Sequence, residues 1–122
     1  MNIFRKFFAM LQLREAVKKA NQAYQTNNHR YYVMPTADLS GKLVVIDRNN
    51  FRILKRKGYI SPKTYVRDLI NECFYYTPNA GGSDALPEYG AMVKAKSFLN
   101  WKDAIRQKKK YLKKNKKTKA KL

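Results

Sequence analysis

The sequence predicts an α+β fold: an N-terminal helix, a β-hairpin, two short helices, and a long C-terminal helix with a lysine-rich tail. Three observations support this prediction. Apolar residues recur every three or four positions near both ends of the chain, as on one face of a helix. Two short runs of β-branched, aromatic and aliphatic residues lie between these segments. Glycine and proline stand where turns or helix ends are expected.

Residues 3–25 are predicted to form the first helix. Its apolar positions recur at steps of three and four, and they are Ile3, Phe7, Met10, Leu13, Val17, Ala20 and Tyr24. Phe4, Phe8 and Leu11 widen this face near its start. A domain of this size needs such a face for its core, so we expect the helix to pack on the hairpin.

A membrane surface is the alternative partner for this first helix. The helix carries both large apolar and basic side chains, as do helices that lie in the interface of a bilayer. In that interpretation the inserted residues are Phe4, Phe7, Phe8 and Leu11. The residues at the headgroups are Arg5, Lys6, Lys18 and Lys19. No segment of the sequence approaches the length of a membrane span.

Two strands are predicted after this helix. Residues 30–34 are aromatic and β-branched, and residues 42–46 form a short apolar run. The connection 35–41 has turn-forming residues at both ends, so the strands should pair as an antiparallel hairpin. Pro35 cannot donate a hydrogen bond to a sheet, and we expect it at the end of the first strand or at an edge.

A short helix is predicted next, over residues 50–57. Asp47 or Asn49 is the expected cap at its start. Gly58 fits the left-handed position that follows a helix, because glycine has no side chain to oppose a positive φ.

A second helix should follow at once and end at Thr77-Pro78. Ser61 suits its N-cap and Pro62 suits its first turn. Its apolar residues fall in adjacent pairs every four residues, which is typical of a helix with one buried face. These residues are Tyr65, Val66, Leu69, Ile70, Cys73 and Phe74.

The last helix is predicted to start near Leu86 or Pro87, with Asp84 as its cap. Its apolar signal thins after Ile105, so it should project from the body and fray into the lysine run. We therefore divide the chain into one α+β domain, residues 1–105, and a basic tail, residues 106–122, that is partly helical or disordered.

Charge is the strongest functional signal in this sequence. The chain has 122 residues and a formal net charge of +19. Residues 102–122 contain eleven basic side chains and one acid, a net +10, and the rest of the chain carries the other +9. Like charges at this density repel one another, so the tail should meet a polyanion rather than fold onto the core. The phosphate backbone of DNA or RNA is the first candidate.

Two groups of basic residues are the candidate nucleic-acid contacts. The tail residues are Arg106, Lys108, Lys109, Lys110, Lys113, Lys114, Lys116 and Lys117. The second group surrounds the short helix and consists of Arg48, Arg52, Lys55, Arg56 and Lys57. Its three arginines are four residues apart, so we expect one exposed stripe backed by a buried Phe51. A solubilising terminus, an anionic lipid surface and an acidic protein remain alternatives for the tail.

Two other patterns have weaker links to nucleic acid. The helices on either side of Gly58 have the outline of a helix-turn-helix, although a plain helical corner explains the pattern better. Tyr31 and Tyr32 beside Arg30 have the chemistry of a base-stacking platform, but ordinary packing is favoured.

Catalysis and metal binding have little support. The one histidine, His29, and the one cysteine, Cys73, cannot form a zinc site, and no catalytic triad or phosphate-binding loop is visible. We expect Cys73 to be buried and inert. A single cysteine is also typical of a reducing, intracellular compartment. We therefore expect neither enzymatic activity nor a cofactor.

The stretch YYVMPTADLSGKLVVIDRNNFRILKRKGYIS, residues 31–61, resembles small basic proteins encoded by phages and mobile elements of gut Bacteroidales. The similarity lies mainly in the hairpin with Pro35 and Thr36 and in the segments DRNNF and LKRKGY. It implies a phage or mobile-element setting, in the bacterial cytoplasm or the virion. It carries over no functional residues.

These observations predict a non-enzymatic protein that binds nucleic acid largely without sequence specificity, as a phage or mobile-element accessory factor. Lysine supplies affinity without sequence choice, because it has no rigid fork of donors. The alternative is a phage structural or assembly protein. Its body would bind a protein partner, and its tail would contact the genome or an acidic surface.

Overall fold

The computed structural model describes the backbone of residues 1–120 and the side chains of residues 1–115. Its helices are α1 (Ile3–Asn27), α2 (Phe51–Arg56), α3 (Leu69–Glu72) and α4 (Glu88–Ala120). Single-turn 3₁₀ helices cover Val66–Asp68 and Ala80–Gly82. The strands are β1 (Tyr32–Pro35), β2 (Leu43–Ile46) and β3 (Tyr75–Tyr76). The predicted α+β class is confirmed.

The three strands form an antiparallel sheet in the order β2-β1-β3. The predicted hairpin is confirmed, with Tyr32 opposite Ile46 and Pro35 opposite Leu43. Pro35 is the last residue of β1 and lies beyond the part that pairs with β3, so it interrupts no hydrogen bond there. The strand β3 was not predicted.

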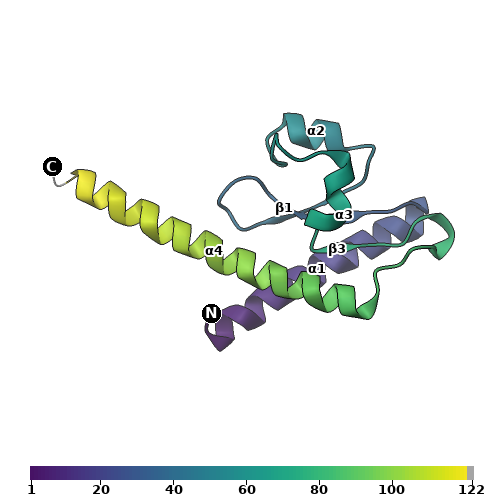
Figure 1. The fold of residues 1–122 in the computed structure, drawn as a ribbon, viewed down its shortest axis with the longest axis horizontal. Helices are drawn as coiled ribbons and strands as arrows, with labels where there is room; N and C mark the ends of the chain where they lie inside the picture. The colour runs from purple at the N-terminus through teal and green to yellow at the C-terminus, as the bar shows by residue number, and fades with distance from the viewer. Residues whose placement is uncertain (121–122) are drawn as a thin grey trace.

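Helices cover both faces of this sheet (Figure 1). Successive side chains of a strand point to opposite faces. Tyr31 and Val33 therefore join a core with α1 and α4, while Tyr32 and Met34 join a second core with α2 and α3. Both tyrosines are buried, which confirms that they pack in the core rather than form an exposed base-stacking platform.

The predicted second helix is wrong over most of its length. After Gly58 the chain forms turns, one 3₁₀ turn and the four-residue α3, and then leaves the helix at Cys73 in an extended conformation. The backbone of Phe74 donates to Val33, at 2.8 Å between nitrogen and oxygen, and that of Thr77 donates to Tyr31 at 3.0 Å. Pairing with β1 satisfied these backbone groups and overrode the helical spacing. A four-residue α3 also removes the recognition helix that a helix-turn-helix requires.

The bounds of the short helix α2 agree with the prediction, but different hydrogen bonds stabilise its start. Asn50 precedes the helix without a side-chain cap bond. Asp47 and Asn50 instead exchange hydrogen bonds, each side-chain oxygen accepting from the other's backbone nitrogen at 2.8 and 2.9 Å. The cap expected of Asn49 is wrong. Gly58 has a φ of +87°, as predicted for the position after the helix.

Over its first half, α1 buries a different face from the one predicted. The buried residues are Ala9, Leu13, Ala16 and Ala20, whereas Ile3, Phe4, Phe7, Phe8, Met10 and Leu11 are exposed. A helix of 25 residues is about 37 Å long, and a strand of four residues about 13 Å. The first turns of α1 therefore extend beyond the sheet, as Figure 1 shows, and only the side that faces α4 has a partner there.

The last helix, α4, starts close to the predicted position and continues to Ala120 without a break. Asp84 is not its cap, because it lies four residues before the helix with a φ of +52°. Phe98 and Ile105 are buried in the body, and every described side chain from Gln107 onward is exposed. The predicted projection from the body is confirmed (Figure 1), whereas the predicted fraying into the lysine run is wrong as far as Ala120.

Candidate nucleic-acid interface

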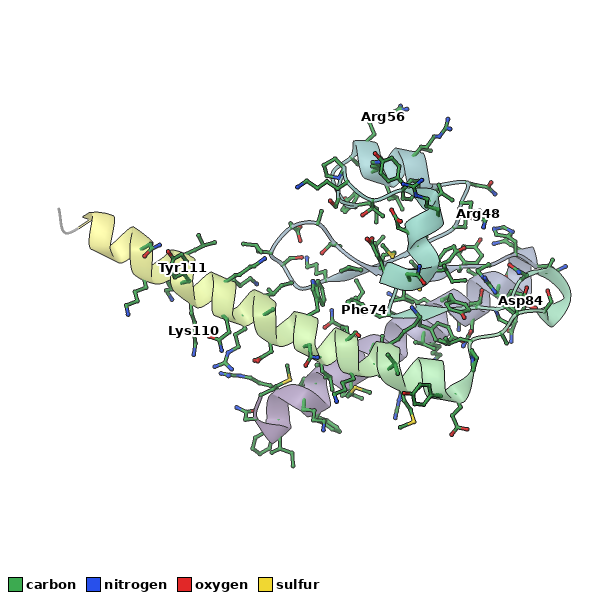
Figure 2. The ribbon with its side chains drawn as sticks, viewed as in Figure 1. Arg48, Arg56, Phe74, Asp84, Lys110 and Tyr111 are labelled. Carbon is green, nitrogen blue, oxygen red and sulfur yellow. The ribbon has the colours of Figure 1, made fainter. Side chains whose placement is uncertain are left out.

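The basic residues of the tail as far as Lys119 lie on α4 rather than on an irregular segment. Lysine, arginine and glutamine are good helix formers, and the body anchors the helix through Phe98, Trp101 and Ile105. No acidic residue follows Asp103 in the sequence. Figure 2 shows Lys110 and Tyr111 on the part of α4 that extends away from the sheet.

Four cations of α4 share one face. Residues three and four apart are neighbours on a helix surface, so the spacing 102, 106, 109, 113 places these side chains in a row. We call this row the α4 stripe, and it consists of Lys102, Arg106, Lys109 and Lys113. By the same geometry Lys110 flanks the stripe, and Lys108 and Lys114 point to other sides. The side chains of Lys116 and Lys117, also predicted contacts, lie outside the described residues.

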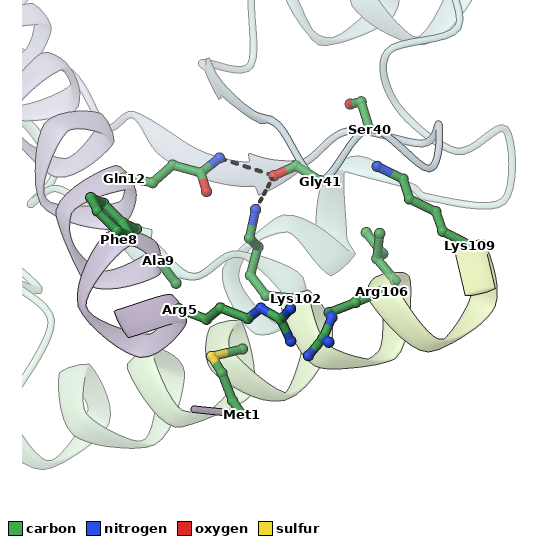
Figure 3. A pocket seen from close by; sticks show the side chains of 11 residues that line it. Met1, Arg5, Phe8, Ala9, Gln12, Ser40, Gly41, Lys102, Arg106 and Lys109 are labelled. Carbon is green, nitrogen blue, oxygen red and sulfur yellow. Dashed lines mark hydrogen bonds between the residues drawn. The ribbon is translucent and has the colours of Figure 1, made fainter. Parts of the chain in front are cut away.

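The stripe begins at a pocket between α1, the hairpin loop and α4 (Figure 3). The pocket has a volume of about 330 Å³, and none of the residues that line it is acidic. Lys102, Arg106 and Lys109 reach it from α4, and Arg5 reaches it from α1. Figure 3 shows the guanidinium groups of Arg5 and Arg106 pointing toward one another. We call Arg5, Lys102, Arg106 and Lys109, with the space that they line, the cation pocket.

The hairpin loop fixes the position of Lys102 in the cation pocket. The carbonyl oxygen of Gly41 accepts from Nε2 of Gln12 at 2.9 Å and from Nζ of Lys102 at 3.1 Å. Gly41 has a φ of +74°, and a β-carbon there would lie 3.1 Å from the same Nζ. Any larger residue at position 41 would therefore push on Lys102 as well as strain the backbone.

The electrostatics of the cation pocket favour an anion. Partial burial, and next the positive charge of Lys109, lower the pKa of Lys102. An anionic group bound between these cations would oppose both effects, because its negative charge favours the protonated form of Lys102. Arginine also presents a fork of donors that matches two oxygens of a phosphate. The arrangement is thus suited to a phosphate group.

Sequence reasoning did not place Arg5 or Lys102 among the nucleic-acid contacts. Lys102 was counted in the basic segment 102–122 but not in the tail 106–122, although its spacing from Arg106 and Lys109 already placed it on their face. Arg5 is 97 positions away from Lys102, and no local pattern connects the two. Only the packing of α1 against α4 brings them together.

The second predicted group, around α2, only partly forms a stripe. Arg52 and Arg56 are exposed and one helical turn apart, and Lys57 is exposed just after the helix. Arg48 is exposed but lies in the turn before α2, so the predicted row of three arginines is wrong. Phe51 is buried on the opposite side, as predicted.

Lys55 was also predicted to contact nucleic acid, but its ammonium group contacts other residues of the protein instead. Its Nζ donates to the carbonyl oxygen of Thr64 at 2.8 Å. The same ammonium lies 5.0 Å from the ring centre of Tyr65 and 5.6 Å from that of Phe51. These contacts satisfy the ammonium within the protein, so Lys55 is poorly placed to contact a ligand.

The structure does not bring the two predicted groups together on one patch. Figure 2 shows Arg48 and Arg56 beside α2 and α3, well separated from Lys110 on the projecting part of α4. The candidate interface is therefore divided. The α4 stripe and the cation pocket form its larger part, and Arg52, Arg56 and Lys57 form a separate exposed group.

Comparisons with protein-family models, with curated proteins and with solved structures found no match for this chain. No described helix combines the length and the apolar character needed to cross a membrane.

Proposed function

We propose that this protein binds nucleic acid without enzymatic activity, mainly through phosphate groups and largely without sequence preference. The observation that supports this proposal is the α4 stripe. Its row of cations begins in the cation pocket and continues along the part of α4 that projects from the body. An α-helix fits the major groove of DNA, and its lysines would reach phosphates on either side. The resemblance to proteins of Bacteroidales phages and mobile elements supports an accessory role in such an element.

The α4 stripe should determine affinity more than net charge does. We expect a K109A/K113A double variant to bind a 30-base-pair duplex more weakly than the wild type. Each phosphate that the variant no longer neutralises should reduce the slope of log affinity against log salt by about 0.9. The measurement is fluorescence anisotropy of labelled DNA over a series of salt concentrations, repeated with an RNA hairpin.

The matched control is a K96A/K108A double variant, which removes the same charge from exposed positions of α4 off the stripe. Its salt slope should stay close to that of the wild type. Equal weakening by both double variants would show that net charge alone governs DNA binding and would refute a special role of the α4 stripe. The absence of any DNA or RNA binding at low salt would refute the proposed function itself.

A further inference from the structure

The start of α1 exposes a cluster of large apolar side chains, which we call the α1 tip. It consists of Ile3, Phe4, Phe7, Phe8 and Leu11, which are exposed by 77%, 73%, 59%, 65% and 38%. The rings of Phe7 and Phe8 contact each other edge to face, with 5.7 Å between their centres. Nothing else in the described chain covers this cluster, because α1 packs on the body through the opposite face.

The helix geometry separates these two faces cleanly. At 3.6 residues per turn, Phe4, Phe7 and Leu11 lie on the side of α1 opposite Ala9 and Leu13. The same outer side continues with Arg14 and Lys18, both exposed. The outer face is therefore apolar for about three turns and mainly basic in the next turns, where Glu15 stands beside Arg14 and Lys18.

Basic groups outnumber acids around the α1 tip. Arg5 and Lys6 flank the apolar face, and the first acid in the sequence, Glu15, is exposed one helical turn after Leu11. The cation pocket adjoins the tip, since Phe8 lines it together with Lys102 and Arg106. A partner for this surface has to offer an apolar phase and negative charge side by side.

An anionic bilayer has this combination. We propose that the α1 tip inserts into the interface of a membrane that contains anionic lipid, while Arg5, Lys6, Arg14 and the cation pocket contact the headgroups. Nucleic acid has no apolar layer that would cover three phenyl rings. A second copy of this chain would bring like charges together around the tip, so the charges oppose self-association there.

The dimensions of the tip agree with binding at the surface of a bilayer. Residues 3–11 span about 14 Å along the helix, against the roughly 30 Å of a hydrocarbon core. Interfacial helices bury an apolar face only about 5 to 10 Å deep, which the side chains of one helix face can reach. This proposal does not rest on nucleic-acid binding, because no residue of the α1 tip belongs to the α4 stripe, although both proposals use the cation pocket.

The test is co-sedimentation of the full chain with vesicles of phosphatidylcholine alone or with 30% phosphatidylglycerol. We expect the wild type to bind the anionic vesicles and an F4S/F7S double variant to bind them at least tenfold more weakly. Both rings are exposed and neither lines the cation pocket, so the fold should remain intact. The matched control is Y89S/M92S, which removes two equally exposed apolar side chains from α4 and should bind within twofold of the wild type.

Several outcomes would overturn the proposal. Unchanged vesicle binding by F4S/F7S would mean that charge alone attracts the protein to lipid, and a wild type that ignores anionic vesicles would exclude the membrane. A wild type that self-associates without vesicles, when F4S/F7S is monomeric in sedimentation, would assign the tip to a dimer interface. A loss of DNA binding by F4S/F7S in the anisotropy measurement would assign the tip to nucleic acid. If DNA binding fails in every variant while vesicle binding follows the tip, only the proposed nucleic-acid function is refuted.

Discussion

At the residue scale, Thr77 connects the third strand to the rest of the sheet. It is fully buried, and its hydroxyl accepts from the backbone nitrogen of Tyr31 at 2.8 Å. The same hydroxyl lies 3.3 Å from the carbonyl oxygen of Pro78, to which it donates. A buried backbone donor left without an acceptor costs about 1 to 3 kcal/mol. One side chain thus stabilises the end of a sheet that has only two residues in β3.

We expect T77V to lower the free energy of unfolding by about 1 to 3 kcal/mol, because valine keeps the shape but leaves Tyr31 unpaired. Urea denaturation followed by circular dichroism measures this change. The control is T26V on the exposed end of α1, which should alter stability by less than about 0.5 kcal/mol. If T77V were as stable as T26V, the hydrogen bond to Tyr31 would not contribute.

A second residue-scale effect concerns Asp47, whose carboxylate lies 2.8 Å from Nε2 of His29. Burial alone would raise the pKa of Asp47 from its ordinary 3.8. Hydrogen bonds from His29 and the backbone of Asn50, and then the charge of His29, lower the pKa overall. A carboxyl whose pKa is lower in the folded state stabilises the fold above its unfolded pKa. That stability is lost as the pH falls through the lower folded value.

We therefore expect D47N to be less stable than the wild type by about 1 to 2 kcal/mol at pH 5, because asparagine carries no charge for His29. The difference should shrink as the pH falls below 3.8, because the unfolded carboxyl binds its proton there before the folded one does. Urea denaturation at pH 5 and pH 3 measures it. A difference that is the same at pH 5 and pH 3 would show that the carboxylate charge has no part in stability.

At the element scale, helices α1 and α4 both extend past the sheet that they cover, and their free ends differ in chemistry. The free part of α1 is apolar, and that of α4 is basic. Isolated helices of about a dozen residues are marginal in water. The outer half of α4 therefore depends on its continuity with the anchored turns at Phe98 and Ile105.

We expect Q107P to uncouple the outer part of α4 from the body without any change in net charge. Proline within a helix costs about 3 kcal/mol and removes a hydrogen bond, so the turns beyond it should lose helical signal in circular dichroism. DNA binding in the anisotropy measurement should weaken, because the stripe loses its alignment. The control is Q107A at the same exposed position. Equal affinity of Q107P and Q107A would show that the tail binds as a polycation in any conformation.

At the scale of the whole molecule, the net charge of +19 is divided between a basic body and a basic projection. Ile105 is the last buried residue among the described side chains, so the body should fold without the projecting part of α4. This is the basis for treating residues 1–105 as a domain, which remains a prediction.

We expect a chain ended after Ile105 to keep its melting temperature within a few degrees and to lose most of its affinity for DNA. The truncation removes ten basic side chains and no acid. The salt slope should fall by about 0.9 for each phosphate that the shorter chain no longer neutralises. Calorimetry and anisotropy measure the two quantities. A truncated body that retains a protein partner from its source would instead favour the assembly-protein alternative, and an unchanged slope would exclude the tail from DNA binding.

Sequence reasoning predicted what depends on local chemistry. The hairpin, the α2 helix with Gly58 after it, and the charge of the tail depend on neighbouring residues, because turn preferences and charge density are local properties. Within the candidate interface, helical spacing alone places the α4 cations in one row, once the helix is known to continue past Ile105.

Tertiary contacts determine the features of the fold and of the interface that local patterns did not predict. The segment that became β3 has helical spacing, and only the free edge of β1 made it a strand. Arg5 joined the cation pocket because α1 crosses α4, and Phe4 and Phe7 stayed exposed because the sheet ends before they do. Each of these results depends on contacts between residues distant in the chain. A pattern of apolar spacing says that a face exists, whereas the length and position of the neighbouring elements determine whether that face is covered.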